Sequence, residues 1–84
     1  MKIYFHPRFA KSFSKLSTTL KARAIDREKI FRINPFNSSL DTHKLHGKLR
    51  NQWSFSVNRK CRIIFEFVDK NVIFLDIGDH SLYQ

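Results

Sequence analysis

The segment QWSFSVNRKCRIIFEFVDKNVIFLDIGD, residues 52–79, decides the fold. Apolar and polar side chains alternate from Trp53 to Asn58, which is typical of a strand with one apolar face. Residues 61–68 and 72–77 are two further runs rich in β-branched and aromatic side chains, each preceded by a short polar break. Breaks this short make neighbouring strands pair directly. The segment therefore predicts three antiparallel strands in a row.

One further strand and two helices are predicted before this segment. Residues 1–5 form a short strand candidate that joins the edge of the sheet. Pro7 suits the first turn of a helix, where its missing N–H is not needed. A second helix is predicted over residues 19–33 and ends before Pro35, because the residue before a proline avoids the α region. Apolar residues lie on two sides of this helix, so we expect both sides to be covered.

The predicted order is β-α-α-β-β-β, an α+β fold with two N-terminal helices packed on one face of a small, mainly antiparallel sheet. We expect one domain over residues 1–84, because the chain is too short for a second core. Residues 36–48 are polar and predicted to be irregular, and loops of about a dozen residues are often functional. The second face of the sheet is expected to stay open.

Charge and cysteine content narrow the class of protein. Sixteen Lys and Arg stand against seven Asp and Glu, a formal charge of +9, which predicts attraction to polyanions and to nucleic acid first. The alternative is a merely solvated basic surface. A lone cysteine, the lack of an apolar run long enough to span a membrane and the lack of a signal peptide predict a cytoplasmic protein.

Strand periodicity sorts the side chains between the two faces of the sheet. On the last strand, Ile73, Leu75 and Ile77 are the more uniformly apolar set and are predicted to face the helices. His43, in the loop before the first of the three strands, is predicted to reach the open face. Four polar residues on and beyond the last two strands are predicted to point to the same face: Arg62, Glu66, Asp76 and His80.

Two imidazoles and a guanidinium are the groups that metal-free RNA cleavage requires. A base takes the 2′-OH proton, an acid protonates the leaving 5′-oxygen, and a fixed cation stabilises the phosphorane. Histidine and arginine suit these duties. The alternatives are structural: Arg62 pairs with Glu66 or Asp76 on the surface, His80 caps the end of the sheet, and His43 is an ordinary loop residue.

Other basic residues and one aromatic residue are candidates for RNA contacts. Tyr83 either stacks on a base or docks on the body of the protein. The basic residues of the second helix either contact a large RNA or lie in solvent. No metal-ligand spacing, Gly-rich phosphate loop or cysteine pair is present, so no metal or cofactor is expected. The candidates for phosphate contacts flank His43 and Arg62: Lys44, Lys48, Arg50, Arg59 and Lys60.

Three segments together resemble the RelE/ParE superfamily of type II toxin–antitoxin toxins, particularly its YafQ and YoeB branches. They are Asn34-Pro35-Phe36, HKLHGKLRNQWSFSV (43–57) and CRIIFEFVDKNVIFLDIGDHSLY (61–83), and the resemblance covers nearly the whole chain. It implies a RelE-like fold and a ribosome-dependent mRNA endonuclease that an acidic antitoxin neutralises.

The resemblance also implies roles for particular residues. His43 matches the general-base position, Arg62 the arginine at the transition-state phosphate, and His80 the C-terminal general acid. Tyr83 lies near the terminal aromatic residue of the family, at a different spacing from His80. The implied partners are an acidic antitoxin, mRNA and the ribosome, with no membrane.

Two other functions compete with the metal-independent mRNA endonuclease. One is a ParE-like gyrase inhibitor that acts by binding protein, although such relatives generally lack this set of histidine and arginine. The other is a catalytically inactive module that binds RNA or an antitoxin.

Overall fold

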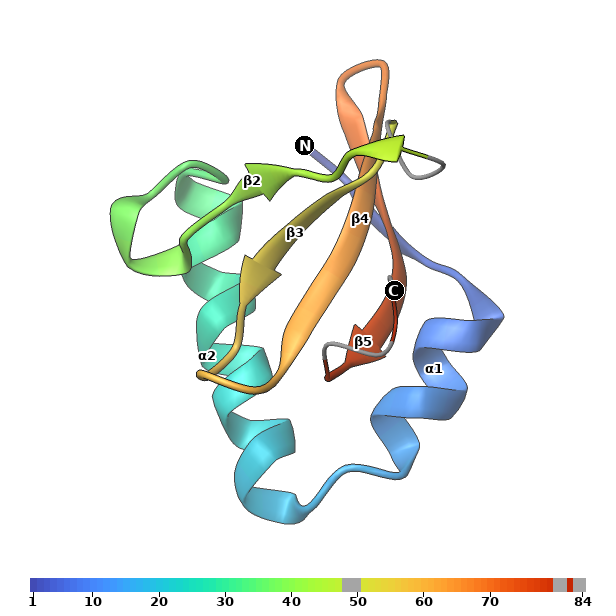
Figure 1. Ribbon diagram of the computed structural model, residues 1–84, viewed down its shortest axis with the longest axis vertical. Helices are drawn as coiled ribbons and strands as arrows, with labels where there is room; N and C mark the ends of the chain where they lie inside the picture. Colours follow the sequence, from blue (N-terminus) through green and yellow to red (C-terminus); the bar gives the residue numbers. More distant parts are fainter. Residues whose placement is uncertain (48–50, 80–81, 83–84) are drawn as a thin grey trace.

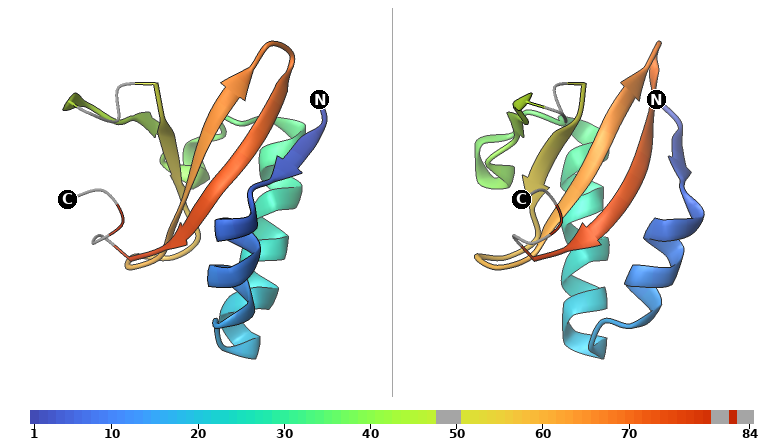
Figure 2. Two further views of the ribbon diagram at one scale, coloured as in Figure 1. Left: turned by 90° about the vertical axis from the view of Figure 1, so that its right-hand side faces the viewer. Right: turned by 45° about the vertical axis from the view of Figure 1, so that its right-hand side comes forward.

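Five strands form one sheet, and both helices lie on one side of it (Figure 1 and Figure 2). The computed structural model describes residues 1–47, 51–79 and 82. The helices are α1 (Pro7–Ser14), α2 (Thr18–Ile33) and a short 3-10 helix, η1 (Ser38–Leu40). The strands are β1 (Ile3–Phe5), β2 (His43–Lys44), β3 (Trp53–Ser56), β4 (Arg62–Val68) and β5 (Asn71–Gly78).

The predicted meander of three strands is confirmed. The strand order is β1-β5-β4-β3-β2, with antiparallel pairing from β5 through to β2. The first strand joins the edge as predicted, and it runs parallel to β5. The turn between β3 and β4 is closed by Asn58, whose side-chain oxygen accepts from the backbone N–H groups of Lys60 and Cys61. The expected α+β fold, with helices on one face only, is therefore correct.

Aromatic rings fill the space between the helices and the sheet. Phe31 of α2 is completely buried and contacts three other phenylalanines. Its ring stacks on Phe55 with a centroid distance of 4.7 Å and meets Phe65 and Phe74 edge-on at 4.9 and 5.4 Å. Such ring pairs add to the stabilisation that apolar burial gives. One helix residue thus joins the three central strands.

The second helix is covered on one side, and the prediction that both sides are covered is wrong. Ser17 caps its first turn by accepting the N–H of Leu20. Ala24 and Phe31 face the core, whereas Ile33 is 88% exposed. Ile25, on the same side of α2 as Ile33, is also 47% exposed. No helix in the described ranges is both long and apolar enough to cross a membrane.

A β-bulge changes which residues of β5 face the helices. Phe65 pairs with Phe74 and Ile64 pairs with Asp76, so Leu75 is the additional residue. The buried set is Val72, Phe74 and Ile77, not the predicted Ile73, Leu75 and Ile77. Asp76 keeps its predicted place on the open face, opposite Ile64.

The segment predicted to be irregular, residues 36–48, contains regular structure. It holds η1 and the two-residue strand β2, which pairs with β3 and makes the sheet one strand wider than predicted. Arg27 of α2 donates from Nε to the carbonyl of Ser56 at 3.1 Å and from Nη2 to the carbonyl of Ser39. The helix therefore fixes η1 and the end of β3 relative to each other.

Phe31→Ala is expected to lower the free energy of unfolding by about 3–5 kcal/mol, because it removes the ring at the centre of the core. Denaturant unfolding measures the change. Ile33→Ala in the same helix is the control and should stay within about 0.5 kcal/mol, because its side chain is exposed. Similar losses for both variants would contradict this description of the core.

Candidate active site

Arg62, the first residue of β4, holds its guanidinium close to the open face. Its side chain is only 13% exposed. The Nε–H donates to the Oγ of Ser54 at 2.9 Å, and Nη2 lies 3.4 Å from the carbonyl oxygen of the same residue. Ser54 lies on β3 and is completely buried. Ser54 of the neighbouring strand therefore fixes the cation and supplies acceptors for guanidinium N–H groups that burial would otherwise leave unpaired.

Asp41 holds the other edge of the guanidinium. Its backbone carbonyl accepts from Arg62 Nη2 at 2.7 Å, and its carboxylate Oδ2 lies 3.3 Å from Nη1. The residue has φ 49° and ψ 47°, a left-handed conformation that Asp and Asn adopt more readily than most residues. This conformation ends η1 and turns the carbonyl of Asp41 toward the guanidinium. The Asp41 side chain is 76% exposed, so the carboxylate contact faces solvent.

His43 lies beside the guanidinium, as predicted. Its Nδ1 is 3.3 Å from Arg62 Nη2 and 3.2 Å from the carbonyl oxygen of Asp41. Nδ1 cannot accept from the arginine and donate to the carbonyl at the same time. The tautomer that donates from Nδ1 to Asp41 carries its lone pair on Nε2, and this is the form that a general base needs.

The loop that carries Asp41 and His43 is held by hydrogen bonds from side chains to backbone carbonyls. Thr42 Oγ1 donates to the carbonyl of Pro35 at 2.6 Å. Arg27 fixes η1 as described above, and Arg23 donates from Nε to the carbonyl of Val57 at 2.5 Å. Burial, and then the nearby charge of Arg23, lowers the pKa of Arg27. Arg27 thus supports the site from the helix side, whereas Arg23 binds the chain just beyond β3.

The strand register places a row of residues across the open face. His43 pairs with Ser54, Ser54 with Ile64, and Ile64 with Asp76. Arg62 was predicted to pair with Glu66 or Asp76 if its role were structural. In the structure its ion-pair partner is Asp41, from the loop before β2.

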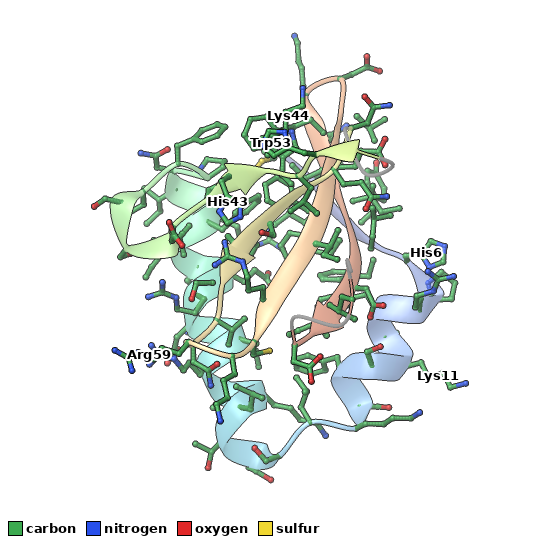
Figure 3. The ribbon with its side chains drawn as sticks, viewed as in Figure 1. His6, Lys11, His43, Lys44, Trp53 and Arg59 are labelled. Atoms are coloured by element: carbon green, nitrogen blue, oxygen red, sulfur yellow. The ribbon has the colours of Figure 1, made fainter. Side chains whose placement is uncertain are left out.

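The remaining predicted site residues fall into two groups. Those that the structure describes do not lie at the guanidinium, and the others lie outside the described residues. Lys44 pairs in register with Trp53 on the helix side of the sheet, and its Nζ lies 6.0 Å from the ring centroid. Arg59 and Lys60 are exposed in the turn between β3 and β4. Figure 3 shows Lys44 and Arg59 toward opposite ends of the molecule. The predicted residues outside the described ranges are His80, Lys48, Arg50 and Tyr83.

Sequence reasoning missed two parts of the site. They are Asp41 and Ser54, and neither was predicted from the sequence to be a site residue. The register of β3 against β4 is the signal for Ser54, because it places this residue diagonally across from Arg62. The contact of Asp41 depends on a left-handed backbone at the end of η1, and the sequence does not indicate it.

Comparison with known proteins gives a family match. The model for "RelE-like toxin of type II toxin–antitoxin system HigB" matches residues 7–80. None of the curated proteins matches the chain.

Solved structures show the same fold. YafQ from Escherichia coli strain BL21(DE3) has a TM-score of 0.78 and 18% identity, over 96% of this chain and 94% of that one. A YoeB/ParE toxin from Agrobacterium tumefaciens has a TM-score of 0.79 and 13% identity, over 95% of this chain and 99% of that one. A chain of the E. coli DinJ–YafQ toxin–antitoxin complex has a TM-score of 0.75 and 18% identity, over 96% of this chain and 93% of that one. At these identities the likeness establishes the fold.

Ser54→Ala is expected to release the guanidinium and to cost about 2 kcal/mol of stability, because it removes a buried acceptor from a charged donor. Denaturant unfolding measures the cost, and the NMR signal of the Arg62 Nε–H should exchange faster with solvent. Ser14→Ala, at an exposed serine of α1, is the control. An unchanged Nε–H signal would contradict the role given to Ser54.

Proposed function

Because the chain belongs to the HigB family of RelE-like toxins of type II toxin–antitoxin systems, we propose that it is a ribosome-dependent, metal-independent endonuclease that cuts mRNA and stops translation. The observation that carries the proposal is the approach of Arg62 Nη2 to within 3.3 Å of His43 Nδ1 on the open face of the sheet. A fixed cation and an acid–base group beside each other suit an anionic substrate.

Arg62 stabilises the phosphorane in this mechanism. Its Nε and Nη2 are engaged by Ser54 and by the carbonyl of Asp41, so the guanidinium is already oriented before substrate binds. Nη1 faces the exposed carboxylate of Asp41. A substrate phosphate replaces that carboxylate at Nη1, because a phosphate oxygen accepts the same kind of charge-assisted hydrogen bond.

His43 acts as the general base. In the tautomer that donates from Nδ1 to Asp41, Nε2 takes the proton of the 2′-OH, and the 2′-oxygen attacks the adjacent phosphorus. The imidazolium that results is held by the carbonyl of Asp41, 3.2 Å from Nδ1. Exposure of His43 lets an RNA strand reach it.

His80 is proposed as the general acid on the strength of the family resemblance. It protonates the 5′-oxygen as the phosphorus–oxygen bond breaks. The products are a 2′,3′-cyclic phosphate on one fragment and a 5′-hydroxyl on the other, so no water is consumed in the step. Lys44, Lys48, Arg50, Arg59, Lys60 and Tyr83 remain proposed RNA contacts.

An acidic antitoxin is the proposed protein partner. The charge of +9 favours an acidic chain, and the similar DinJ–YafQ structure is a toxin–antitoxin complex. An apolar groove of about 450 Å³ lies between the two helices and is lined partly by the exposed side chains of Phe5 and Ile25. This groove suits an apolar helix face of the same partner, while an acidic segment covers Arg62.

Arg62→Ala is expected to lower the rate of mRNA cleavage at least about 100-fold, because it removes the cation at the phosphorane. His43→Ala should lower it by a similar factor. Cut sites are mapped by primer extension on a message translated in a purified system. Arg32→Ala, at an exposed arginine of α2 paired with Glu28, is the control and should cut normally.

Three outcomes would contradict the proposal. Undiminished cleavage by the Arg62 and His43 variants would overturn the roles of these residues. A DNA-damage response with intact mRNA would indicate a gyrase inhibitor. Binding to ribosomes without cleavage by the wild-type protein would indicate an inactive binding module.

Asp41→Asn is expected to lower the apparent KM for RNA about two- to fivefold, because it removes an anion that competes with phosphate for Nη1. Asparagine also tolerates the left-handed backbone, so the carbonyl contact to Nη2 is kept. The gain should shrink as salt rises. Asp26→Asn, an exposed acid of α2, is the control. A raised KM for Asp41→Asn alone would show that the carboxylate assists substrate binding.

A further inference from the structure

A small pocket of about 180 Å³ lies on the open face of the sheet, over β4 and β5. Ile64 of β4, Leu75 of β5 and Leu82 form its apolar part. Its polar part combines donors and acceptors from the β1–α1 junction, from the residue before β3 and from β5: His6, Arg8, Gln52 and Asp76. None of these residues has a part in the cleavage mechanism described above.

The β-bulge in β5 builds this pocket. Without the additional residue, Leu75 and Asp76 would point to opposite faces of the sheet. With it, both line the same pocket, while Phe74 and Ile77 stay in the core. Bulges often re-aim side chains beside functional sites. The distortion therefore places an apolar surface and a carboxylate side by side on the open face.

The pocket lies within reach of an RNA strand bound at Arg62. Asp76 is in the row that runs from His43 through Ser54 and Ile64, three strand spacings from His43. At about 5 Å for each spacing, the two residues are about 15 Å apart. Figure 3 shows His6 and His43 toward opposite edges of the sheet. A few nucleotides of extended single strand bridge this distance, so a base a few positions from the cleaved bond can enter the pocket.

The hydrogen bonds within the pocket define what it can recognise. Asp76 Oδ1 accepts the N–H of Ile77 at 2.8 Å, which orients the carboxylate and leaves Oδ2 as an acceptor. His6 Nδ1 accepts the N–H of Arg8 at 3.0 Å, so the neutral imidazole carries its proton on Nε2 and donates from there. The Gln52 carboxamide can donate and accept.

We propose that this pocket receives a base of the RNA a few nucleotides from the cut, and that Asp76 selects a base with an amino group over uracil. A carboxylate accepts from amino groups on base edges. Guanine presents two adjacent donors to a carboxylate, a ring N–H and an amino group. Uracil presents one N–H between two carbonyl oxygens, and the negatively charged carboxylate repels these oxygens. The donors of His6 and Arg8 serve the guanine carbonyl or a phosphate. The choice of RNA as ligand rests on the proposed function.

Binding of GMP and UMP to the wild-type protein, followed by NMR titration, tests the pocket without any cleavage. GMP is expected to bind about tenfold more tightly than UMP and to shift the backbone amides of Leu75, Asp76 and Ile77. Equal affinities, or shifts confined to the surroundings of Arg62, would overturn the proposal.

Asp76→Asn isolates the role of the carboxylate. Asparagine keeps an oxygen for the N–H of Ile77 and replaces Oδ2 by a donor, so the variant should fold normally and lose the preference for GMP. Glu66→Gln makes the same change at a residue of β4 that shares the open face and does not line the pocket, and it should keep the preference. A preference retained by Asp76→Asn would show that Asp76 does not read the base.

Mapping of cut sites separates failure of the pocket from failure of the nuclease. On a translated message with randomised codons, the wild-type protein should disfavour uracil at one position within a few nucleotides of the cut. Asp76→Asn should cut messages with uracil at that position several-fold more often. Wild-type cleavage with the same base profile in both proteins would overturn the pocket and leave the nuclease intact. A wild-type protein that leaves mRNA whole but prefers GMP would overturn the nuclease and leave a base-binding pocket.

Discussion

The structure of the open face depends on how one cation is accommodated near the middle of a sheet. A largely buried guanidinium without partners would be costly, because its donors lose water. Arg62 meets this constraint through an oxygen from the next strand and a backbone carbonyl from the loop beyond it. Those two contacts need a buried serine on β3 and a left-handed residue at the end of η1. The short strand β2 then follows directly and places His43 beside the cation.

The two faces of the sheet impose different demands on the same strand. The helix side needs large apolar side chains at regular intervals, and Val72, Phe74 and Ile77 supply them. The open side needs polar groups. Strict alternation along β5 would not satisfy both demands, since it would put Phe74 and Ile77 on opposite faces. The additional residue Leu75 resolves the conflict. It shifts the register locally, so that Phe74 and Ile77 both face the core while Asp76 faces the open side.

Periodicity predicted the strands and helices well, because burial of apolar side chains at fixed spacing dominates their formation. It also placed Arg62 on the open face, whereas His43 was assigned there from its place in the loop before the first of the three strands. It failed where the backbone departs from regular geometry. The bulge at Leu75 shifted the burial of half a strand, and the left-handed Asp41 supplied a contact that composition does not indicate. The expectation that both sides of α2 are covered failed for another reason: an apolar side chain such as Ile33 can lie on a helix surface that faces solvent.

The parallel pairing of β1 with β5 has a consequence for when the molecule acquires its shape. Ile3 lies opposite Val72, so the first strand finds its place only after nearly all of the other elements have been synthesised. Contacts between such distant positions slow folding, because a large loop must close before they form. The first helix also cannot complete its packing until β5 has been synthesised, since Phe9 packs on Phe74. A nascent chain that lacks β5 therefore has an unfinished core and an open sheet edge, which is the stage at which it is most exposed to aggregation and proteolysis.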